Sequence, residues 1–212
     1  MPWTKKFLIV GAIACLLPAC GDLIVVRDRA AVAQGAKRAL PPLSLEDFEG
    51  GAQGYGYGDK EAGGSAEIST ETRDVHQGAK ALRCEYRSGS QGWGAGFDVE
   101  VASLPKAGYF NFDGYRGIGF WAKLPAGTNA FLQLGEAKSG LGQGENYLAQ
   151  DFTGTGRWKQ YYFAFDGFAR NPYTGNQGGN GVLDLAAIRT LSFSIRERQG
   201  ADVFFLDQLY CR

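Results

Sequence analysis

The sequence of 212 residues is poor in the residue types on which many enzymes and nucleic-acid-binding proteins depend. It contains a single histidine, His76, so histidine-based catalytic triads are disfavoured and a histidine-rich metal site is excluded. Basic and acidic residues number 22 each and cancel. This balance gives no indication of nucleic acid or an anionic surface as a partner.

Long apolar runs are also missing from most of the chain, whereas glycine and aromatic residues are abundant. Glycine occurs 32 times and separates many short apolar runs. This pattern favours an all-β fold rich in turns over disorder. Phe, Tyr and Trp make up 13% of the residues. They suit the core of a β-sandwich and could also supply a sugar-binding surface, and composition does not choose between these uses.

The first residues have the build of a secretory signal. Lys5-Lys6 precede the short apolar run Phe7–Leu17, which is too short for a membrane-spanning helix. The run ends in Leu17-Pro18-Ala19-Cys20, which resembles the bacterial lipobox. We therefore expect residues 1–19 to be a signal peptide, Cys20 to be lipidated, and residues 20–42 to form a tether. Proline is uncommon at the place that Pro18 takes in such signals, so a plain secreted protein without a lipid is the alternative.

A single domain is expected over residues 43–212. Within it, Asn146–Phe152 and Trp158–Phe165 are predicted strands joined by a tight turn, and Tyr161, Phe163 and Phe165 alternate onto one face. Further strands are expected at Glu46–Gly50, Ser65–Thr70, Ala81–Tyr86, Gly94–Val99, Arg116–Lys123, Asn129–Leu134, Thr190–Ile195 and Val203–Tyr210.

The strands Arg116–Lys123 and Asn129–Leu134 are interpreted as the central pair of one sheet. Their inward residues would be Ile118, Phe120, Ala122, Leu132 and Leu134. Gly51–Gly58 and Arg170–Gly181 are interpreted as loops, and a single helical turn is possible at Leu183–Ile188. The predicted architecture is a monomeric β-sandwich of two antiparallel sheets packed face to face.

The order of these signals resembles carbohydrate-binding module family 11, a β-jelly roll with a galactose-binding-like fold that binds β-glucans. The resemblance runs from Glu46–Gly50 through Asp166-Gly167-Phe168 and Leu183-Asp184-Leu185 to Leu206–Leu209. It implies non-catalytic binding of a glucan-type polysaccharide or oligosaccharide through a concave sheet face. With the signal, it implies an exported bacterial lipoprotein that faces the periplasm or the cell surface and contacts the membrane only through its lipid.

Strand parity predicts which side chains form that face. Opposite the inward Leu191, Phe193 and Ile195 lie polar residues, and neighbouring strands add aromatic ones. The predicted face consists of Phe131, Gln133, Glu145, Tyr147, Ser192, Ser194 and Arg196. Aromatic rings stack on sugars while amides and charged groups bind hydroxyls, so this mixture suits a saccharide. An ordinary solvated sheet face is the alternative.

The resemblance adds ligand-binding positions one by one. Tyr57 matches a tyrosine of the family's first loop, and Gln143 stands where the family has an acidic residue before Gly144-Glu145. Arg170 and Tyr173 match an arginine and a tyrosine, and Ser192 replaces a histidine. Trp93 matches a tryptophan, although Gly92 replaces the tyrosine before it. Trp93 could be a sugar-stacking tip or a core anchor.

The resemblance also implies two structural features. The strand of Cys84 would lie beside that of Cys211, which makes a disulfide plausible in an oxidising compartment, against two separate buried thiols as the alternative. A structural calcium ion is expected at Glu49 and Asp207, with Asp47 as a weaker third ligand. The alternative is that Asp207 caps a turn or pairs with an arginine.

Catalysis is not expected. Glu136, Glu145 and Asp151 could approach one another, and glycosidases use two carboxylates, but the spacing matches no hydrolase signature known to us. A lipoprotein that binds a protein partner or envelope component, and a glycan-acting hydrolase, remain the alternatives to a carbohydrate-binding protein.

Overall fold

The computed structural model describes residues 40–99, 109–137, 143–196 and 199–212. The chain divides into two compact units, Met1–Lys37 and Arg38–Arg212. The predicted signal peptide, Cys20 with its predicted lipidation, and nearly all of the predicted tether lie outside the described residues. All features below belong to the second unit.

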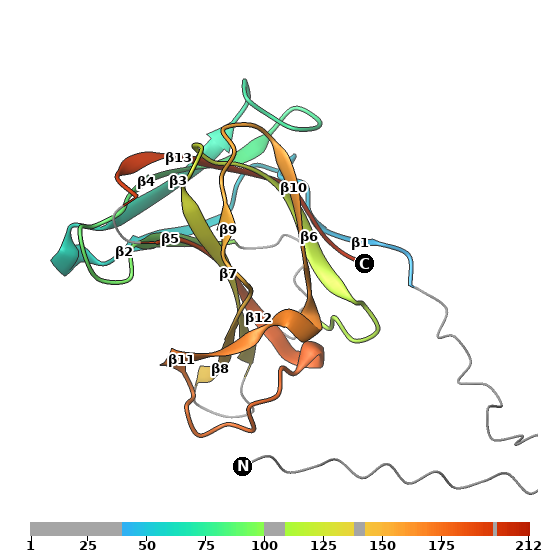
Figure 1. Cartoon of the computed structure of the whole chain (residues 1–212). Helices are drawn as coiled ribbons and strands as arrows, with labels where there is room; N and C mark the ends of the chain where they lie inside the picture. The colour runs from blue at the N-terminus through green and yellow to red at the C-terminus, as the bar shows by residue number, and fades with distance from the viewer. Residues whose placement is uncertain (1–39, 100–108, 138–142, 197–198) are drawn as a thin grey trace, which may run out of the picture. The chain divides into compact units, whose positions relative to one another are not determined.

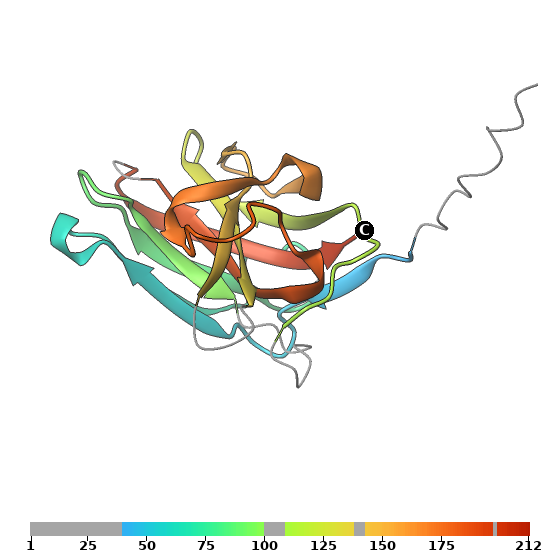
Figure 2. The same ribbon diagram turned by 90° about the horizontal axis from the view of Figure 1, so that it is seen from below.

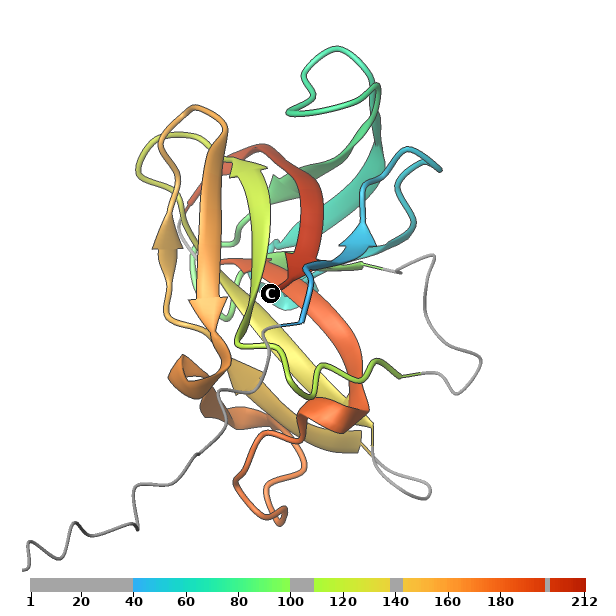
Figure 3. The same ribbon diagram turned by 90° about the vertical axis from the view of Figure 1, so that its right-hand side faces the viewer.

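One sheet has six strands in the order β10-β6-β13-β4-β3, with β1 paired to β13 beside this path. Figure 3 shows β10 in orange, β6 in yellow-green and β13 in red lying side by side. All its pairings are antiparallel. Its strands are β1 (Leu43–Glu46), β3 (Ser65–Glu71), β4 (Ala81–Arg87), β6 (Gly117–Lys123), β10 (Lys159–Ala164) and β13 (Ala201–Cys211).

The other sheet has seven strands in the order β11-β8-β7-β12-β5-β2, with β9 paired to β7. Its pairings are also antiparallel. Its strands are β2 (Gly54–Gly58), β5 (Ala95–Val99), β7 (Asn129–Ala137), β8 (Gln143–Leu148), β9 (Phe152–Thr153), β11 (Ala169–Gly175) and β12 (Ile188–Ile195).

The predicted all-β sandwich is confirmed (Figure 1). The two sheets enclose one apolar core in which Phe97, Phe120, Phe193 and Phe204 are fully buried and contact one another edge-on or stacked. The inward residues expected in β6, β7 and β12 are all buried. Only short 3-10 turns interrupt the strands of the described segments, at η2 (Lys60–Ala62, between β2 and β3 in Figure 2), η3 (Phe165–Gly167) and η4 (Leu185–Ala187).

Two expected strand pairings are wrong. The strands β6 and β7 follow each other in sequence but belong to different sheets, so they are not a central pair. Likewise β10 pairs with β6, whereas the preceding β8 and β9 pair with β7. In both places the chain crosses between the layers at a turn. Alternation marks which side chains face the core, but it does not say which sheet a strand joins.

The first strand begins earlier than expected and ends at Glu46. Phe48 follows with φ of 60° and is completely buried, so its backbone turns to place the ring in the core. β1 lies antiparallel to the end of β13, with Leu43 opposite Cys211. The start and the end of the domain therefore lie side by side, as Figures 1 and 3 show near the C-terminus.

The stretch Gly54–Gly58, expected to be a loop, is an edge strand. A Cβ on Gly56 would lie 2.1 Å from the carbonyl oxygen of Ala66, and one on Gly58 would lie 2.3 Å from a backbone carbon of Gly64. The glycines thus let β2 approach the backbone of β3 in the other sheet. The intervening Tyr55 and Tyr57 point the other way. Glycine-rich composition, which suggested a turn, here reflects close approach of two strands.

The expected disulfide is contradicted, because Cys84 and Cys211 are both free and buried. Their strands are neighbours as expected, but Cys84 lies opposite Phe204 in β13. Cys211 follows Phe204 by about seven residues, a separation of roughly 23 Å along an extended strand. A disulfide needs Cα atoms within about 7 Å. The two thiols therefore pack separately in the core.

Candidate functional site

The outer face of the seven-stranded sheet, called the ligand face below, carries the best candidate site. Its floor comes from residues that alternate with the core residues of β5, β7 and β12. Ser192 lies between Asp98 and Gln133 on its two neighbouring strands, and Ser194 lies between Gly96 and Phe131. Since cross-strand partners point the same way, these side chains share one face. The predicted outward positions of Gln133, Ser192 and Ser194 are thereby confirmed.

Three aromatic residues form one end of the ligand face, called the aromatic end: Tyr55, Tyr57 and Trp93. The ring of Tyr57 lies 6.1 Å from that of Tyr55 and 5.7 Å from that of Trp93. A Cβ on Gly96 would come within 2.8 Å of the Tyr57 ring, so this glycine lets the ring lie across β5 toward Ser194. Trp93 is 46% exposed and Tyr55 is 55% exposed. Trp93 is thus a surface tip and not a core anchor.

A carboxylate lies at the foot of the aromatic end. The hydroxyl of Tyr55 donates to Oδ2 of Asp98 over 2.5 Å. The other oxygen, Oδ1, is buried and has no hydrogen-bond partner among the described residues. Burial, followed by the nearby charge of Asp98, raises the pKa of Tyr57 above its usual value. Both effects keep the Tyr57 hydroxyl neutral and available for hydrogen bonds.

Tyr173 forms the opposite end of the ligand face. It is 88% exposed, and its N–H donates to Oδ1 of Asn171. The Asn171 amide in turn donates to Oε1 of Gln133 over 2.7 Å. The segment Arg170–Gly181 was expected to be a loop, but its first part belongs to strand β11. The buried Asn171 fixes this strand to the floor and holds the tyrosine ring at the rim.

Phe131 and Arg196 lie together in the middle of the face. The Arg196 guanidinium lies 4.1 Å from the centre of the Phe131 ring. It also donates two hydrogen bonds to Asp151, at 2.9 and 2.6 Å. Arg196 thus covers the Phe131 ring, which is only 8% exposed, and its charge is neutralised by Asp151. Phe131 supports the floor and offers no open stacking surface.

The predicted placement of Tyr147, Glu145 and Arg170 is wrong. Tyr147 lies opposite the core residue Leu134 and opposite Arg170, so both turn to the inner side of the sheet. Tyr147 is only 2% exposed, and burial raises its pKa to about 12. Glu145 is buried there too, paired with Arg170 over 2.9 Å and accepting from the N–H of Gly181. The loop before η4 covers this cluster, and parity alone could not show that cover.

The carboxylates considered for hydrolysis do not form an open pair. Asp151 lies on the ligand face with Arg196. Glu136 and Glu145 interact on the inner side, where burial is the main cause and Glu145 a further cause of the raised pKa of Glu136. Glu136 accepts from the N–H of Asp184. A glycosidase needs two carboxyl groups on either side of an accessible bond, and this buried pair does not offer that arrangement.

Sequence reasoning missed Tyr55, Asp98 and Asn171. Tyr55 was missed because β2 was read as a loop, although the alternation of glycine and tyrosine over Gly54–Gly58 was visible. Asp98 lies in the expected strand Gly94–Val99, where its position next to the inward Phe97 was the signal. Asn171 had no signal beyond its place in a polar loop. Gln143 begins β8, but its side chain lies outside the described residues.

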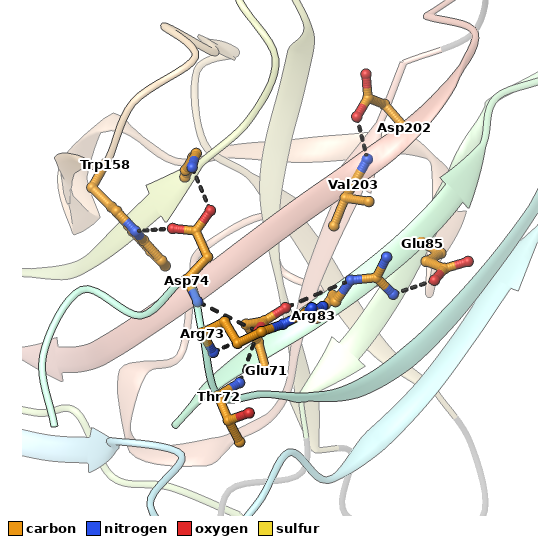
Figure 4. Close-up of polar contacts among 10 residues, drawn as sticks. Glu71, Thr72, Arg73, Asp74, Arg83, Glu85, Trp158, Asp202 and Val203 are labelled. Atoms are coloured by element: carbon orange, nitrogen blue, oxygen red, sulfur yellow. Dashed lines mark hydrogen bonds and ion pairs between the residues drawn. The ribbon is translucent and has the colours of Figure 1, made fainter. Parts of the chain in front are cut away.

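The outer face of the six-stranded sheet is organised differently (Figure 4). Glu71 accepts from the N–H groups of Thr72 and Arg73 at 2.9 and 2.7 Å, which turns the chain over the sheet. Asp74 pairs with Lys123 and accepts from the Trp158 indole over 3.0 Å. Further along this loop, the His76 ring stacks on Trp121 at 3.7 Å. The aromatic rings of this face are held within the protein's own contacts.

This second face contains a shallow hollow of about 470 Å³ between β3, β4 and β13. Within its lining, Arg83 pairs with Glu85 and also lies 3.8 Å from Glu71. The one aromatic residue in the lining, Tyr86, is 3% exposed. We therefore place the candidate site on the ligand face despite this hollow, because exposed rings and uncommitted polar groups decide recognition more than concavity does.

The two carboxylates expected to bind calcium hold the loop of residues 76–80 by hydrogen bonds. Asp207 accepts from the N–H groups of His76 and Gln77. Glu49 accepts from those of Ala79 and Lys80 through one oxygen, and the Lys80 ammonium donates to the Glu49 carbonyl oxygen over 2.9 Å.

No group of three or more acidic, cysteine or histidine residues is arranged for a metal in the described segments. Glu49 and Asp207 would need backbone carbonyl oxygens to complete the six to eight oxygens that calcium prefers. Asp207 caps the turn at His76 and Gln77, as the alternative interpretation expected, and the calcium ion stays a prediction.

Comparison with known proteins agrees with this architecture. No protein-family model matches the sequence, and no curated protein is similar to it. Among solved structures, the family 11 carbohydrate-binding module of Clostridium thermocellum, in complex with a β-1,3-1,4-mixed-linked tetrasaccharide, superposes with a TM-score of 0.63 at 20% identity, covering 82% of this chain and 96% of that one. The family 30 module of a cellulosomal cellulase from the same organism gives a TM-score of 0.59 at 15% identity, covering 82% and 98%. The chain shares the fold of these carbohydrate-binding modules.

Proposed function

We propose that this protein binds a polysaccharide or oligosaccharide without acting on it, through the ligand face. One observation carries the proposal: exposed aromatic rings at both ends of a sheet face flank a polar floor. Tyr55 and Trp93 lie at one end and Tyr173 at the other. The floor between them includes Gln133, Asn171 and Ser192. The likeness in fold to two families of carbohydrate-binding modules supports it.

Binding would follow from stacking and hydrogen bonding. The C–H faces of sugar rings are apolar and stack on aromatic side chains, while hydroxyls exchange hydrogen bonds with amides, carboxylates and serine hydroxyls. Asn171 and Gln133 of the floor are already fixed by a hydrogen bond to one another, so little of their side-chain freedom is lost on binding. A chain of sugars would lie across the strands from Trp93 to Tyr173. Within this proposal we favour a glucan-type polymer, as the tetrasaccharide complex of the similar module suggests.

A glycan array probed with the purified protein tests the proposal, followed by titration calorimetry on responsive glycans. Trp93→Ala and Tyr173→Ala should each weaken binding by about 1–3 kcal/mol, because the stacking area is lost outright. Folding of both variants is checked by melting temperature. Unchanged affinity in both would remove the ligand face from consideration. An array without any response would favour the alternative of a protein partner.

We also propose that Cys20 anchors the protein to a bacterial membrane. The lipobox-like segment supports this, and lipidation adds apolar surface that partitions into a bilayer. No helix in the described segments is long and apolar enough to cross a membrane. Cys20→Ser should move the protein from the membrane fraction to the soluble fraction. Persistent membrane association of this variant would contradict lipid anchoring.

The expected calcium ion stays a prediction on which no part of this function depends. A ligand that binds only the folded state raises its melting temperature by mass action. If calcium bound near Glu49 and Asp207, chelator would lower the melting temperature of the protein and added calcium would restore it. If protein stripped of metal beforehand melts at the same temperature with calcium and with chelator, the expected calcium ion is contradicted.

A further inference from the structure

Asp98 differs from Asp151 and Glu145 because no ion pair within the described residues neutralises it. Asp151 lies against Arg196, and Glu145 lies against Arg170. Among the described residues, none of the ion pairs includes Asp98. A partly buried charge without a counter-ion is costly, so this end of the ligand face favours the approach of a positive group.

Tyr55 carries the effect of this charge to the surface. Its hydroxyl donates to Asp98 over 2.5 Å, while the ring is 55% exposed. Hydrogen bonds to ionised groups polarise the donor, which makes the face of the phenol ring more negative. Cations are attracted to such ring faces. Asp98 therefore acts as a positioning residue through Tyr55.

Trp93 and Tyr57 extend this surface into a continuous aromatic wall. Tyr57 contacts both neighbours, with its ring tilted 54° from Tyr55 and 45° from Trp93. Trp93 is 46% exposed, and tryptophan is the ring that cations prefer. An exposed tryptophan also stacks on a sugar ring. The wall thus offers a stacking surface for a sugar and a negative surface for a cation in adjacent places.

We propose that the aromatic end selects a sugar that carries a protonated amine, an amino sugar such as glucosamine, over the same sugar in neutral form. This rests on the proposed function, because the amine is presented by a glycan bound on the ligand face. The sugar ring stacks on Trp93, and its ammonium lies over the Tyr55 ring with Asp98 behind it. The same charge disfavours glycans made of uronic acids.

Titration calorimetry with three oligosaccharides of equal length and linkage tests this inference: those of glucose, N-acetylglucosamine and glucosamine, at a pH where the free amine is protonated. Wild type should bind the glucosamine oligomer about five- to tenfold more tightly than the N-acetylated one, as expected for one close charge plus a cation–π contact. High salt should reduce this preference.

Asp98→Asn is the matched variant, because the amide oxygen still accepts from Tyr55 while the charge is gone. It should remove most of the preference for glucosamine, measured as the ratio of the affinities for the glucosamine and glucose oligomers in the same variant. Tyr55→Phe, which keeps the ring and loses the bond to Asp98, should reduce the preference in part. Melting temperatures of both variants serve as the check on folding.

The outcomes separate the two proposals. Equal affinity of wild type for the glucosamine and N-acetylglucosamine oligomers overturns the inference but leaves carbohydrate binding intact. An Asp98→Asn variant that loses affinity for all three oligomers alike also overturns it, since the residue then acts on the shape of the face and not through charge. Absence of binding to these oligomers and to every glycan of the array overturns the proposed function itself.

Discussion

The outer faces of the two sheets contain similar side chains, but they use them in opposite ways. On the six-stranded sheet, Trp158 donates to Asp74, and Asp74 pairs with Lys123. On the seven-stranded sheet, Trp93 is 46% exposed and Asp98 has no ion pair within the described segments. Groups that satisfy one another stabilise the fold, whereas groups left open can bind something else. Residue type alone does not tell whether a group stabilises the fold or binds a ligand. The distinction depends on whether the group already has partners within the protein.

The largest expected effects come from exchanging the two tryptophans for alanine. Trp158→Ala should lower the free energy of unfolding by about 1–3 kcal/mol, since packing and the bond to Asp74 are lost together. It should leave glycan affinity unchanged. Trp93→Ala should weaken glycan binding instead. It should change the free energy of unfolding by less than about 0.5 kcal/mol, because an exposed ring contributes little to stability. Chemical denaturation and calorimetry on both variants measure these effects, and weaker glycan binding by Trp158→Ala would end the distinction between the faces.

Replacing Asp74 or Asp98 by asparagine should have a smaller effect on stability than replacing Trp158, and the two effects should have opposite signs. Asp74→Asn removes one member of an ion pair and should lower the free energy of unfolding by about 0.5–1.5 kcal/mol. Asp98→Asn removes an unpaired, partly buried charge and should leave the melting temperature unchanged or raised. Thermal melting at neutral pH compares them. A clear drop for Asp98→Asn would mean that its charge is satisfied within the fold.

The smallest effect concerns the ionisation of Tyr57. Burial first, and the charge of Asp98 second, raise the pKa of this phenol above its ordinary value of about 10. Because the folded-state pKa is higher than the unfolded one, the associated stability is present below about pH 10 and is lost as pH rises further. Absorbance titration of tyrosinate should show several late-ionising groups, among them Tyr147, and one of these groups should be absent from Tyr57→Phe. In Asp98→Asn it should ionise at lower pH, and an unchanged titration would argue against the influence of Asp98.

How much of this could be read from the sequence differs between the core and the ligand face. Alternation identified the buried Leu191, Phe193 and Ile195 correctly because apolar residues at every second position have one stable placement. Tyr147 was misplaced because a tyrosine is stable on either face of a strand. Its burial depends on a distant loop that also covers Glu145. Likewise, the role of the glycines in β2 depends on β3 lying against them, which local sequence does not state.

The pairing of β1 with the end of β13 has a mechanical consequence. Leu43 lies directly opposite Cys211, so both ends of the domain leave from the six-stranded sheet. A load applied through the residues before Leu43 enters that sheet first and pulls on the β1–β13 hydrogen bonds. A polymer held on the ligand face pulls instead on the seven-stranded sheet. If the protein is tethered at one end and holds a glycan at the other, tension passes between the layers through the packed phenylalanine rings of the core, and those contacts would set the force that the domain withstands.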